Sequence, residues 1–208
     1  MMHRLVEAQP LGESVRALQF DHPALDHRRP GQVVVVTDEE GGRGYFALAS
    51  APGEPAAIWV RPAGGTSAWL ATRRPGDAVG ALQAVGEGFA PDPDVRRPWL
   101  VLVTGTGLAA VRALVQERLA TAPDAPITVV HGARAEPDRP GAGLLDAWQT
   151  RGVRVLRTVS GAPRVQIVGA DLLRDPNVAV YAAGPRGLLD DADAVRAAHG
   201  ADPVRRNF

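Results

Sequence analysis

The hydrophobic pattern of the chain changes near residue 95, and this change constrains the fold more than any other feature. Before it, short apolar runs such as QVVVVTD and AAIWVRP alternate with turns rich in Gly, Pro and Asp. Regularly spaced short strands separated by such turns are typical of a β-barrel or sandwich. We therefore predict an antiparallel β-barrel over residues 1–95, with one short helix near TSAWLATR.

Beyond residue 95, strand-like runs alternate with segments of helical spacing. PWLVLVTG, PITVVHGA, VRVLRTVS and NVAVYAAG have the composition of strands, whereas GLAAVRALVQERLA, GLLDAWQTRG and RGLLDDADAVRAAHG carry apolar residues at helical intervals. This alternation predicts a doubly wound α/β domain with a parallel sheet over residues 96–208. The join, FAPDPDVRRPW, contains three prolines and four charged residues, a composition typical of a linker.

Composition excludes several classes of function. The 208 residues suffice for two small domains and include no Cys, which excludes disulfides, thiolate metal sites and cysteine-ligated iron–sulfur clusters. The 23 basic and 23 acidic residues cancel, so bulk charge does not favour nucleic acid or an anionic membrane. No apolar run approaches about 18 residues, and MMHRLVEAQP lacks the apolar core of a signal peptide. We expect a cytoplasmic protein without membrane insertion.

The chain also offers no convincing catalytic triad or metal cluster. His22 and His27 lie with Asp21 and Asp26 in a turn-rich segment, where a solvated loop is favoured over a metal site. His131 ends a predicted parallel strand, so contact with a ligand and a satisfied strand-end histidine are both open. We expect no metal.

A glycine turn follows the first predicted parallel strand. VLVTGTGLAAVRALV places Gly105 and Gly107 between strand and helix, where backbone can approach a phosphate and the helix offers free N–H groups. The third glycine of the usual dinucleotide fingerprint is missing, so a plain tight turn remains the alternative. The strand ends TGTG, HGAR, TVSG and AAGP carry Gly, small or polar residues, which suits a cleft floor for a flat ligand.

The second parallel strand ends without the acidic residue expected to bind the adenosine ribose of NAD. Arg134 follows it instead. An arginine at this position can pair with a 2′-phosphate, and a solvated surface arginine is the alternative.

Several segments, in order, resemble the ferredoxin–NADP reductase-like flavoprotein family. PGQ with an apolar strand, and a strand ending in ALAS, are similar to that family's flavin barrel, and GGTSAWLATRRPGD is similar to its Gly-x-x-Ser segment and Pro-Gly-Asp turn. VTGTGLAAVRALV resembles its pyridine-nucleotide loop, and HGAR, TVS, YAAGPRGLL and the final NF resemble later signatures. The resemblance covers essentially the whole chain. FALAS and VGEGFA are similar to a divergent branch that also occurs in plants.

The resemblance implies a flavin-binding barrel over residues 1–95 and an NAD(P)-binding domain over residues 96–208. For FAD it implies contacts with Phe46, Ala47, Leu48, Ala49, Ser50, Gly64, Gly65, Thr66, Ser67 and Phe208. For NAD(P)H it implies contacts with Thr104, Gly105, Thr106, Gly107, Arg134, Ser160, Gly184 and Pro185, with Arg164 as a further neighbour. Phe46, Thr106 and Phe208 are expected near the rings. No acid, base or metal is expected, because hydride transfer between stacked rings is the cofactor's own chemistry.

The flavin strand departs from the family's Arg-x-Tyr-Ser pattern. Aligned on ALAS, the Arg falls on Gly44, the Tyr on Phe46 and the Ser on Ala47. The phosphate-pairing arginine is therefore missing unless Arg43 replaces it, and only backbone N–H groups can reach flavin N5. Phe46 can still stack on a ring. In the nucleotide domain, Ala110 replaces the family's Pro and Ala183 its Cys.

The sequence is compatible with three functions. The first is an FAD-dependent NAD(P)H oxidoreductase that delivers electrons to a separate acceptor, which could be a ferredoxin, a flavodoxin, an oxygenase-type protein or a small molecule. The second is a flavin reductase that uses free flavin as substrate, as the missing Arg and Ser suggest. The third is a degenerate, non-catalytic subunit with a reductase fold.

Overall fold

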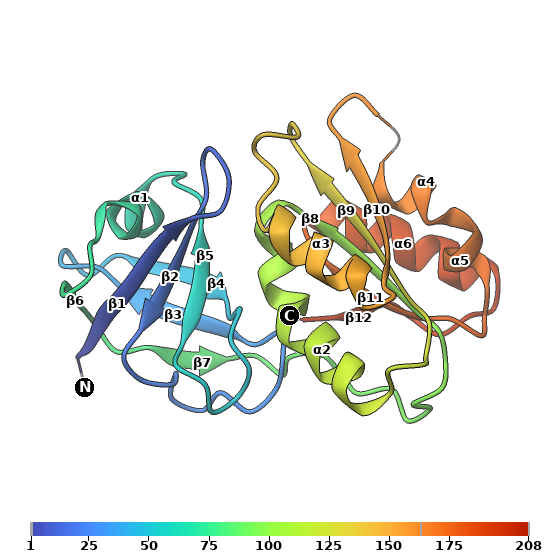
Figure 1. Ribbon diagram of the computed structural model, residues 1–208, viewed down its shortest axis with the longest axis horizontal. Helices are drawn as coiled ribbons and strands as arrows, with labels where there is room; N and C mark the ends of the chain where they lie inside the picture. Colours follow the sequence, from blue (N-terminus) through green and yellow to red (C-terminus); the bar gives the residue numbers. More distant parts are fainter. Residues whose placement is uncertain (1, 163, 208) are drawn as a thin grey trace.

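The structure, a computed structural model, describes residues 2–162 and 164–207 and has two sheet-based halves side by side (Figure 1). The fold class expected from the sequence is confirmed: strands of the first half pair antiparallel, and those of the second half pair parallel. The last strand of the first half ends at Val85 and the next begins at Trp99. The predicted boundary at residue 95 falls in the segment between them.

The first half is a curled pair of antiparallel sheets. One has the order β5-β2-β1-β6 and the other β4-β3-β7, and a bridge between Leu48 and Ile58 joins them. Along β3, Val34 and Val36 point into the core while their neighbours are half-buried, the alternation expected of a strand with one buried face. The elements are β1 (His3–Pro10), β2 (Arg16–Phe20), β3 (Val33–Thr37), β4 (Arg43–Ala47), β5 (Ala57–Val60), α1 (Gly65–Thr72), β6 (Ala78–Val79) and β7 (Gln83–Val85).

The second half is a five-stranded parallel sheet in the order β10-β9-β8-β11-β12. Val101 and Val103 of β8 face α2 and α3, whereas Leu100 and Leu102 face α4, α5 and α6, so helices cover both sides (Figure 1). The elements are β8 (Trp99–Thr104), the 3₁₀ turn η1 (Gly105–Gly107), α2 (Leu108–Thr121), β9 (Ile127–Ala133), α3 (Ala142–Thr150), β10 (Arg154–Val159), α4 (Val165–Val168), α5 (Ala170–Arg174), β11 (Ala179–Ala183), α6 (Arg186–Ala198) and β12 (Arg205–Arg206).

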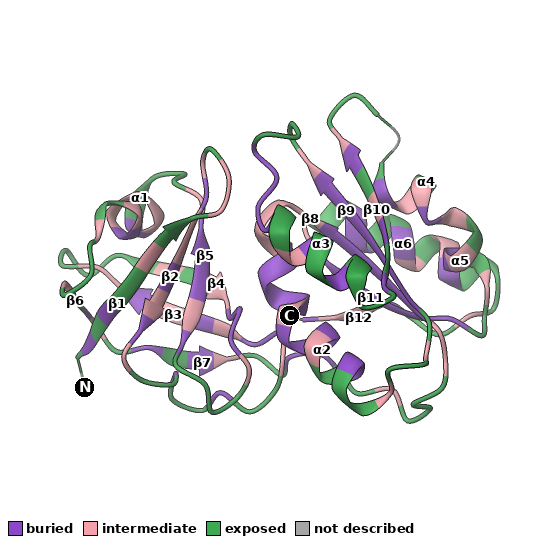
Figure 2. Cartoon of the chain, in the orientation of Figure 1, coloured by how far each residue is buried: buried purple, intermediate pink, exposed green. Residues whose placement is uncertain are grey.

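The two halves meet along α2. One hydrophobic cluster contains Ala49 and Trp59 from the first half together with Leu108 and Ala110 of α2, and the start of α2 is buried (Figure 2). Polar contacts reinforce this contact: Arg112 of α2 donates to the carbonyl oxygen of Ala49 at 2.8 Å. The shared cluster holds the ends of β4 and β5 against the glycine turn, which positions the candidate site.

Some elements were not predicted. β1 has a register shift between Leu5 and Glu7, so its apolar residues do not alternate along its length. The segment AVGALQAV reads as one strand in the sequence but forms two short strands, β6 and β7. The short α4, α5 and β12 have no clear periodic signal. Within the described parts of the chain, no helix is both long enough and apolar enough to cross a bilayer.

Candidate functional site

A cavity of about 1060 Å³ lies at the carboxyl ends of the parallel strands; we call it the strand-end cavity. The sheet reverses its winding between β8 and β11, and doubly wound folds bind ligands at such a switch point. Loops after β8, β9, β10 and β11 all contribute to the wall. The wall contains every residue predicted for the pyridine nucleotide: Thr104, Gly105, Thr106, Gly107, Arg134, Ser160, Arg164, Gly184 and Pro185. The structure thus brings this predicted set together.

Close packing explains the glycines of this cavity. A Cβ on Gly107 would lie 2.5 Å from the carbonyl oxygen of Ala183, and one on Gly184 would lie 2.6 Å from Thr104 Oγ1. Gly105 has a φ of +51°, which favours glycine. Helix α2 continues directly from this turn, and the N–H of Leu108 already donates to the Gly105 carbonyl oxygen. The turn has no side-chain cap, so the N–H groups that face an anion are those of the turn itself.

The charge of the strand-end cavity is positive. Its wall carries the guanidinium groups of Arg61, Arg134 and Arg164 against the one carboxylate of Asp191. Arg61 is paired with Asp138 at 2.6 Å, and Arg164 lies 3.8 Å from Asp191. Arg134 is exposed and has no ion-pair partner within the part of the chain that the structure describes. It is therefore the cation with most freedom to pair with a ligand phosphate.

A second, smaller cavity of about 190 Å³ lies between the two halves; we call it the interdomain cavity. Aromatic side chains from β4 and β5 form one wall and the glycine turn forms the other. Its residues are Tyr45, Phe46, Ala47, Trp59, Thr106, Gly107, Ala110, Ala183, Gly184 and Asn207. Thr106, Gly107 and Gly184 also line the strand-end cavity, so the two cavities adjoin.

Asn207 is the polar residue that distinguishes the interdomain cavity. It is 2% exposed, and neither the nitrogen nor the oxygen of its side-chain amide has a hydrogen-bond partner among the residues that the structure describes. An unpaired buried amide is costly unless a ligand or water completes it. An aromatic wall with an unpaired amide is a lining that suits a flat heteroaromatic ring. The neighbouring residue, Phe208, also predicted at this site, lies outside the described residues.

The predicted flavin strand is divided between two cavities. Phe46 and Ala47 face the interdomain cavity, Leu48 is in the barrel core, and Ala49 and Ser50 line a different cavity. The N–H groups of Leu48 and Ala49 donate to Gln32 and Ala57 carbonyl oxygens at 3.0 and 2.7 Å. The Ser50 hydroxyl accepts from the Ala57 N–H at 3.1 Å. The structure therefore groups only Phe46 and Ala47 of this run with the glycine turn.

The start of α1, predicted to hold the FAD diphosphate, lies apart from both cavities and beside an acid. Gly64, Gly65 and Ser67 precede or open the helix, and the Ser67 hydroxyl is engaged with the loop, accepting from the Ala63 N–H and donating to the Gly64 oxygen. The Thr66 hydroxyl donates to Asp38 at 2.8 Å, and this hydrogen bond is the main reason that the pKa of Asp38 lies below its usual value. A negative charge thus adjoins this helix start.

The position of the missing arginine is occupied by a ring. A Cβ on Gly44 would lie 2.6 Å from Phe46 Cε2, so the phenyl ring covers Gly44. Arg43, the proposed replacement, is exposed and has no ion-pair partner in the described ranges 2–162 and 164–207. The chain therefore offers a ring site but no fixed cation for a diphosphate at the start of α1.

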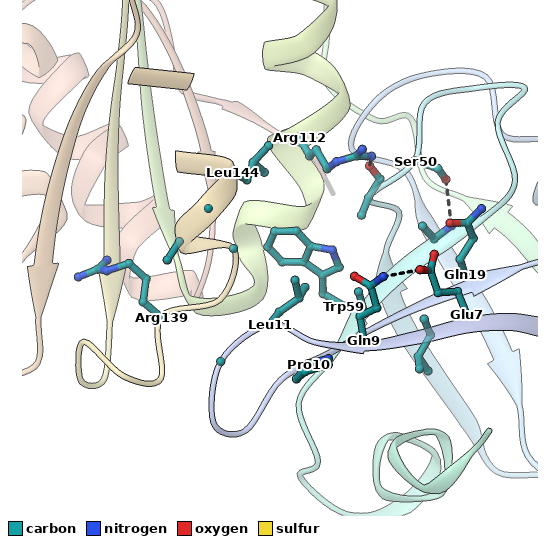
Figure 3. Close-up of a pocket in the computed structure, with 18 of the residues that line it drawn as sticks. Glu7, Gln9, Pro10, Leu11, Gln19, Ser50, Trp59, Arg112, Arg139 and Leu144 are labelled. Atoms are coloured by element: carbon teal, nitrogen blue, oxygen red, sulfur yellow. Dashed lines mark hydrogen bonds between the residues drawn. The ribbon is translucent and has the colours of Figure 1, made fainter. Parts of the chain in front are cut away.

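A third cavity, of about 780 Å³, lies between the outer face of β1, β2 and β5 and the helices α2 and α3 (Figure 3). We call it the sheet-face cavity. Glu7, Gln9 and Gln19 project into it from the sheet, and Trp59 forms its inner wall. Trp59 also lines the interdomain cavity, so the indole separates the two.

A buried polar chain lies beneath the glycine turn. His131 is fully buried, its Nε2 lies 3.0 Å from the Gly105 oxygen, and burial lowers its pKa to about 4. Arg139, 2% exposed, donates to the His131 carbonyl oxygen at 2.7 Å and pairs with Glu136 through two nitrogens. Figure 3 shows the Arg139 side chain pointing away from Trp59, toward the parallel sheet.

Sequence reasoning missed several cavity residues. The sequence did not single out Tyr45, Trp59, Arg61 or Asn207 as site residues, although all four line a cavity. Their exposure to the cavities depends on contacts between the two halves, which leave no periodic signal. Among the described residues, no group of three or more acidic or histidine side chains could hold a metal ion.

Comparisons with known proteins find one curated relative in sequence and many solved structures with a similar fold. The chain is 33% identical over 144 residues to ferredoxin–NADP reductase B of Sorangium cellulosum, covering 65% of this chain and 59% of that protein. It resembles a solved Amycolatopsis cytochrome P450 reductase, GcoB, with a TM-score of 0.84 and 21% identity over 99% of this chain and 68% of that one. It also resembles a solved variant of Plasmodium falciparum ferredoxin–NADP⁺ reductase, with a TM-score of 0.83 and 14% sequence identity. That match covers 99% of this chain and 95% of the other chain. No family model matches.

Proposed function

We propose that this chain, which resembles ferredoxin–NADP reductases in sequence and in fold, is a flavin-dependent NAD(P)H oxidoreductase. The observation that supports this proposal is the shared wall of the two cavities, formed by Thr106, Gly107 and Gly184. A nicotinamide at the mouth of the strand-end cavity and a ring in the interdomain cavity would meet where the two cavities adjoin at these residues. Direct contact between two flat rings is what hydride transfer needs.

In this proposal each half of the chain has a defined task. The glycine turn and Arg134 hold the phosphates of NAD(P)H, while Phe46, Trp59 and Asn207 surround the flavin ring. FAD, when bound by these residues, would supply the redox chemistry that links NAD(P)H to an electron acceptor. The acceptor is a separate ferredoxin, flavodoxin, oxygenase-type protein or small molecule. The chain spans about three-fifths of the curated relative it matches.

The test is a spectroscopic titration of the full chain. FAD is added to the purified protein, followed by NADPH or NADH without oxygen. Loss of the visible flavin band at a rate that saturates with NAD(P)H is expected. A chain that binds neither flavin nor NAD(P)H contradicts the proposal and favours a non-catalytic subunit.

A second candidate function has its own support. Gly44, the ring of Phe46 and the Asp38 carboxylate stand where a diphosphate would need a cation. A carboxylate near a diphosphate weakens its binding. These residues fit a flavin that is held by its ring and exchanges freely, which is the behaviour of a flavin reductase. Saturable dependence of the rate on added free FMN or riboflavin, with no flavin retained after gel filtration, would select this candidate over the first.

A further inference from the structure

The carbonyl oxygen of Gly105 points inward, onto the buried imidazole of His131. The oxygen lies 3.0 Å from Nε2 and also accepts the N–H of Leu108, so it is held from two sides. A carbonyl oxygen can only accept a hydrogen bond. The contact therefore requires the His131 proton to be on Nε2.

The other ring nitrogen of His131 faces a group that can only donate. Arg139 Nη1 lies 3.4 Å from Nδ1, and a guanidinium has no acceptor. Both contacts thus favour the same neutral tautomer, which burial also favours, because it lowers the pKa of His131 to about 4. The tautomer is set by partners on both sides of the ring.

Arg139 is itself fixed by a set of contacts that leaves it little freedom. It donates to the carbonyl oxygens of His131 in β9, at 2.7 Å, and Thr158 in β10, at 3.2 Å. Its remaining N–H groups meet the Glu136 carboxylate at 2.7 and 2.5 Å. The ends of two adjacent strands, the imidazole and the glycine turn therefore form one connected unit.

The direction of the Gly105 oxygen determines the direction of the next N–H. In a trans peptide the carbonyl oxygen and the following N–H point in opposite directions. With the Gly105 oxygen directed into the protein, the N–H of Thr106 is directed outward, on the side where Gly105, Thr106 and Gly107 line the strand-end cavity. Rotation of this peptide would withdraw the donor.

We propose that His131 is a positioning residue for dinucleotide binding: by holding the Gly105 oxygen, it keeps the Thr106 N–H aimed at the ligand's diphosphate. Arg139 holds the imidazole in the tautomer that this task requires. The inference rests on the proposed function, in which the strand-end cavity binds NAD(P)H.

Two probes separate this role from simple stability. ADP-ribose contains the diphosphate and adenosine does not, and binding of both to the full chain is measured by calorimetry or NMR titration. For His131→Leu we expect ADP-ribose affinity to fall about tenfold, the effect of losing one hydrogen bond to a charged group, while adenosine affinity is unchanged. His131→Gln, which carries an N–H donor at a comparable reach, should restore most of the loss.

His3→Leu is the matched control, because His3 is also a fully buried histidine but lies in β1, in the other half. It should leave both affinities unchanged. Equal weakening of both probes in His131→Leu, or no recovery in His131→Gln, would overturn the inference. Failure of the unaltered protein to bind ADP-ribose would instead count against the proposed function.

The tautomer can be read without any variant. Long-range ¹H–¹⁵N spectra of the unaltered protein should show His131 neutral, with its proton on Nε2, at neutral pH. A proton on Nδ1, or a charged ring, would refute the proposal even if no His131 variant folds.

Discussion

Acidification should destabilise this protein partly through one residue, His131. The pKa of this imidazole is lowered to about 4 in the folded chain, against an ordinary value of 6.5, chiefly because it is buried. Between these two pH values the unfolded chain binds a proton at His131 that the folded chain does not. The folded state therefore has its full stability above pH 6.5 and loses it as the pH falls toward 4.

The size of the effect follows from the two pKa values. One pKa unit corresponds to about 1.4 kcal/mol, so the difference between 6.5 and about 4 sets a limit of about 3 kcal/mol. At pH 5 the unfolded chain is almost fully protonated at this position and the folded chain is not. About 2 kcal/mol of stability should then be lost through His131 alone.

Urea unfolding at several pH values measures this loss. His3 and His27 also have lowered pKa values through burial, so the total loss in the unaltered protein should exceed that of His131. His131→Gln removes one titration and leaves the others. Between pH 7.5 and 5 the free energy of unfolding should fall by about 2 kcal/mol less in His131→Gln than in the unaltered protein. Parallel curves would show that His131 keeps an ordinary pKa in the folded protein, and would contradict the effect of burial on this imidazole.

The remaining predictions concern the cavities. Gly107→Ala would bring a Cβ to 2.5 Å from a backbone oxygen; it should cost about 1–3 kcal/mol in the free energy of unfolding and weaken ADP-ribose binding. Gly143 lies in α3, and a Cβ added there would have no atom within 4 Å. Gly143→Ala should therefore raise the free energy of unfolding by about 0.5–1 kcal/mol. Urea unfolding measures the change in both variants. Asp38→Asn should raise the affinity for FAD several-fold in fluorescence titrations, because it removes a negative charge beside the start of α1. The affinity for riboflavin, which has no phosphate, should not change. If Asp38→Asn and the unaltered protein bind FAD equally well, no diphosphate lies near α1. Arg134→Glu should lower kcat/KM for NADPH about tenfold relative to NADH, and an unchanged ratio would assign Arg134 to the solvated surface.

The parallel half of the fold was accessible from the sequence because its signals are local. Apolar strands such as the one that holds Leu100 and Val101 are buried on both faces and stand out as continuous runs. Each ends in Gly or small polar residues, so the wall of the strand-end cavity could be predicted as well. Strand β1 was missed, since its register shift after Leu5 breaks the alternation that identifies a strand.

The interdomain site was only partly predictable. Phe46 was expected beside a ring from the resemblance, and it lines the interdomain cavity. Trp59 and Asn207 become cavity residues only when the halves meet, a contact between residues far apart in sequence. Ser50 was expected to contact FAD, but its hydroxyl accepts a hydrogen bond from the Ala57 N–H. No local sequence pattern reveals this pairing.

The position of Trp59 also makes the protein an optical sensor of its own occupancy. The indole borders the interdomain cavity on one side and the sheet-face cavity on the other. Its emission should therefore respond to a molecule entering either space, and the difference spectrum between the unaltered protein and Trp59→Phe isolates this signal from the other three tryptophans. Quenching by a bound flavin and a shift caused by a colourless compound between sheet and helices would be distinguishable in one cuvette.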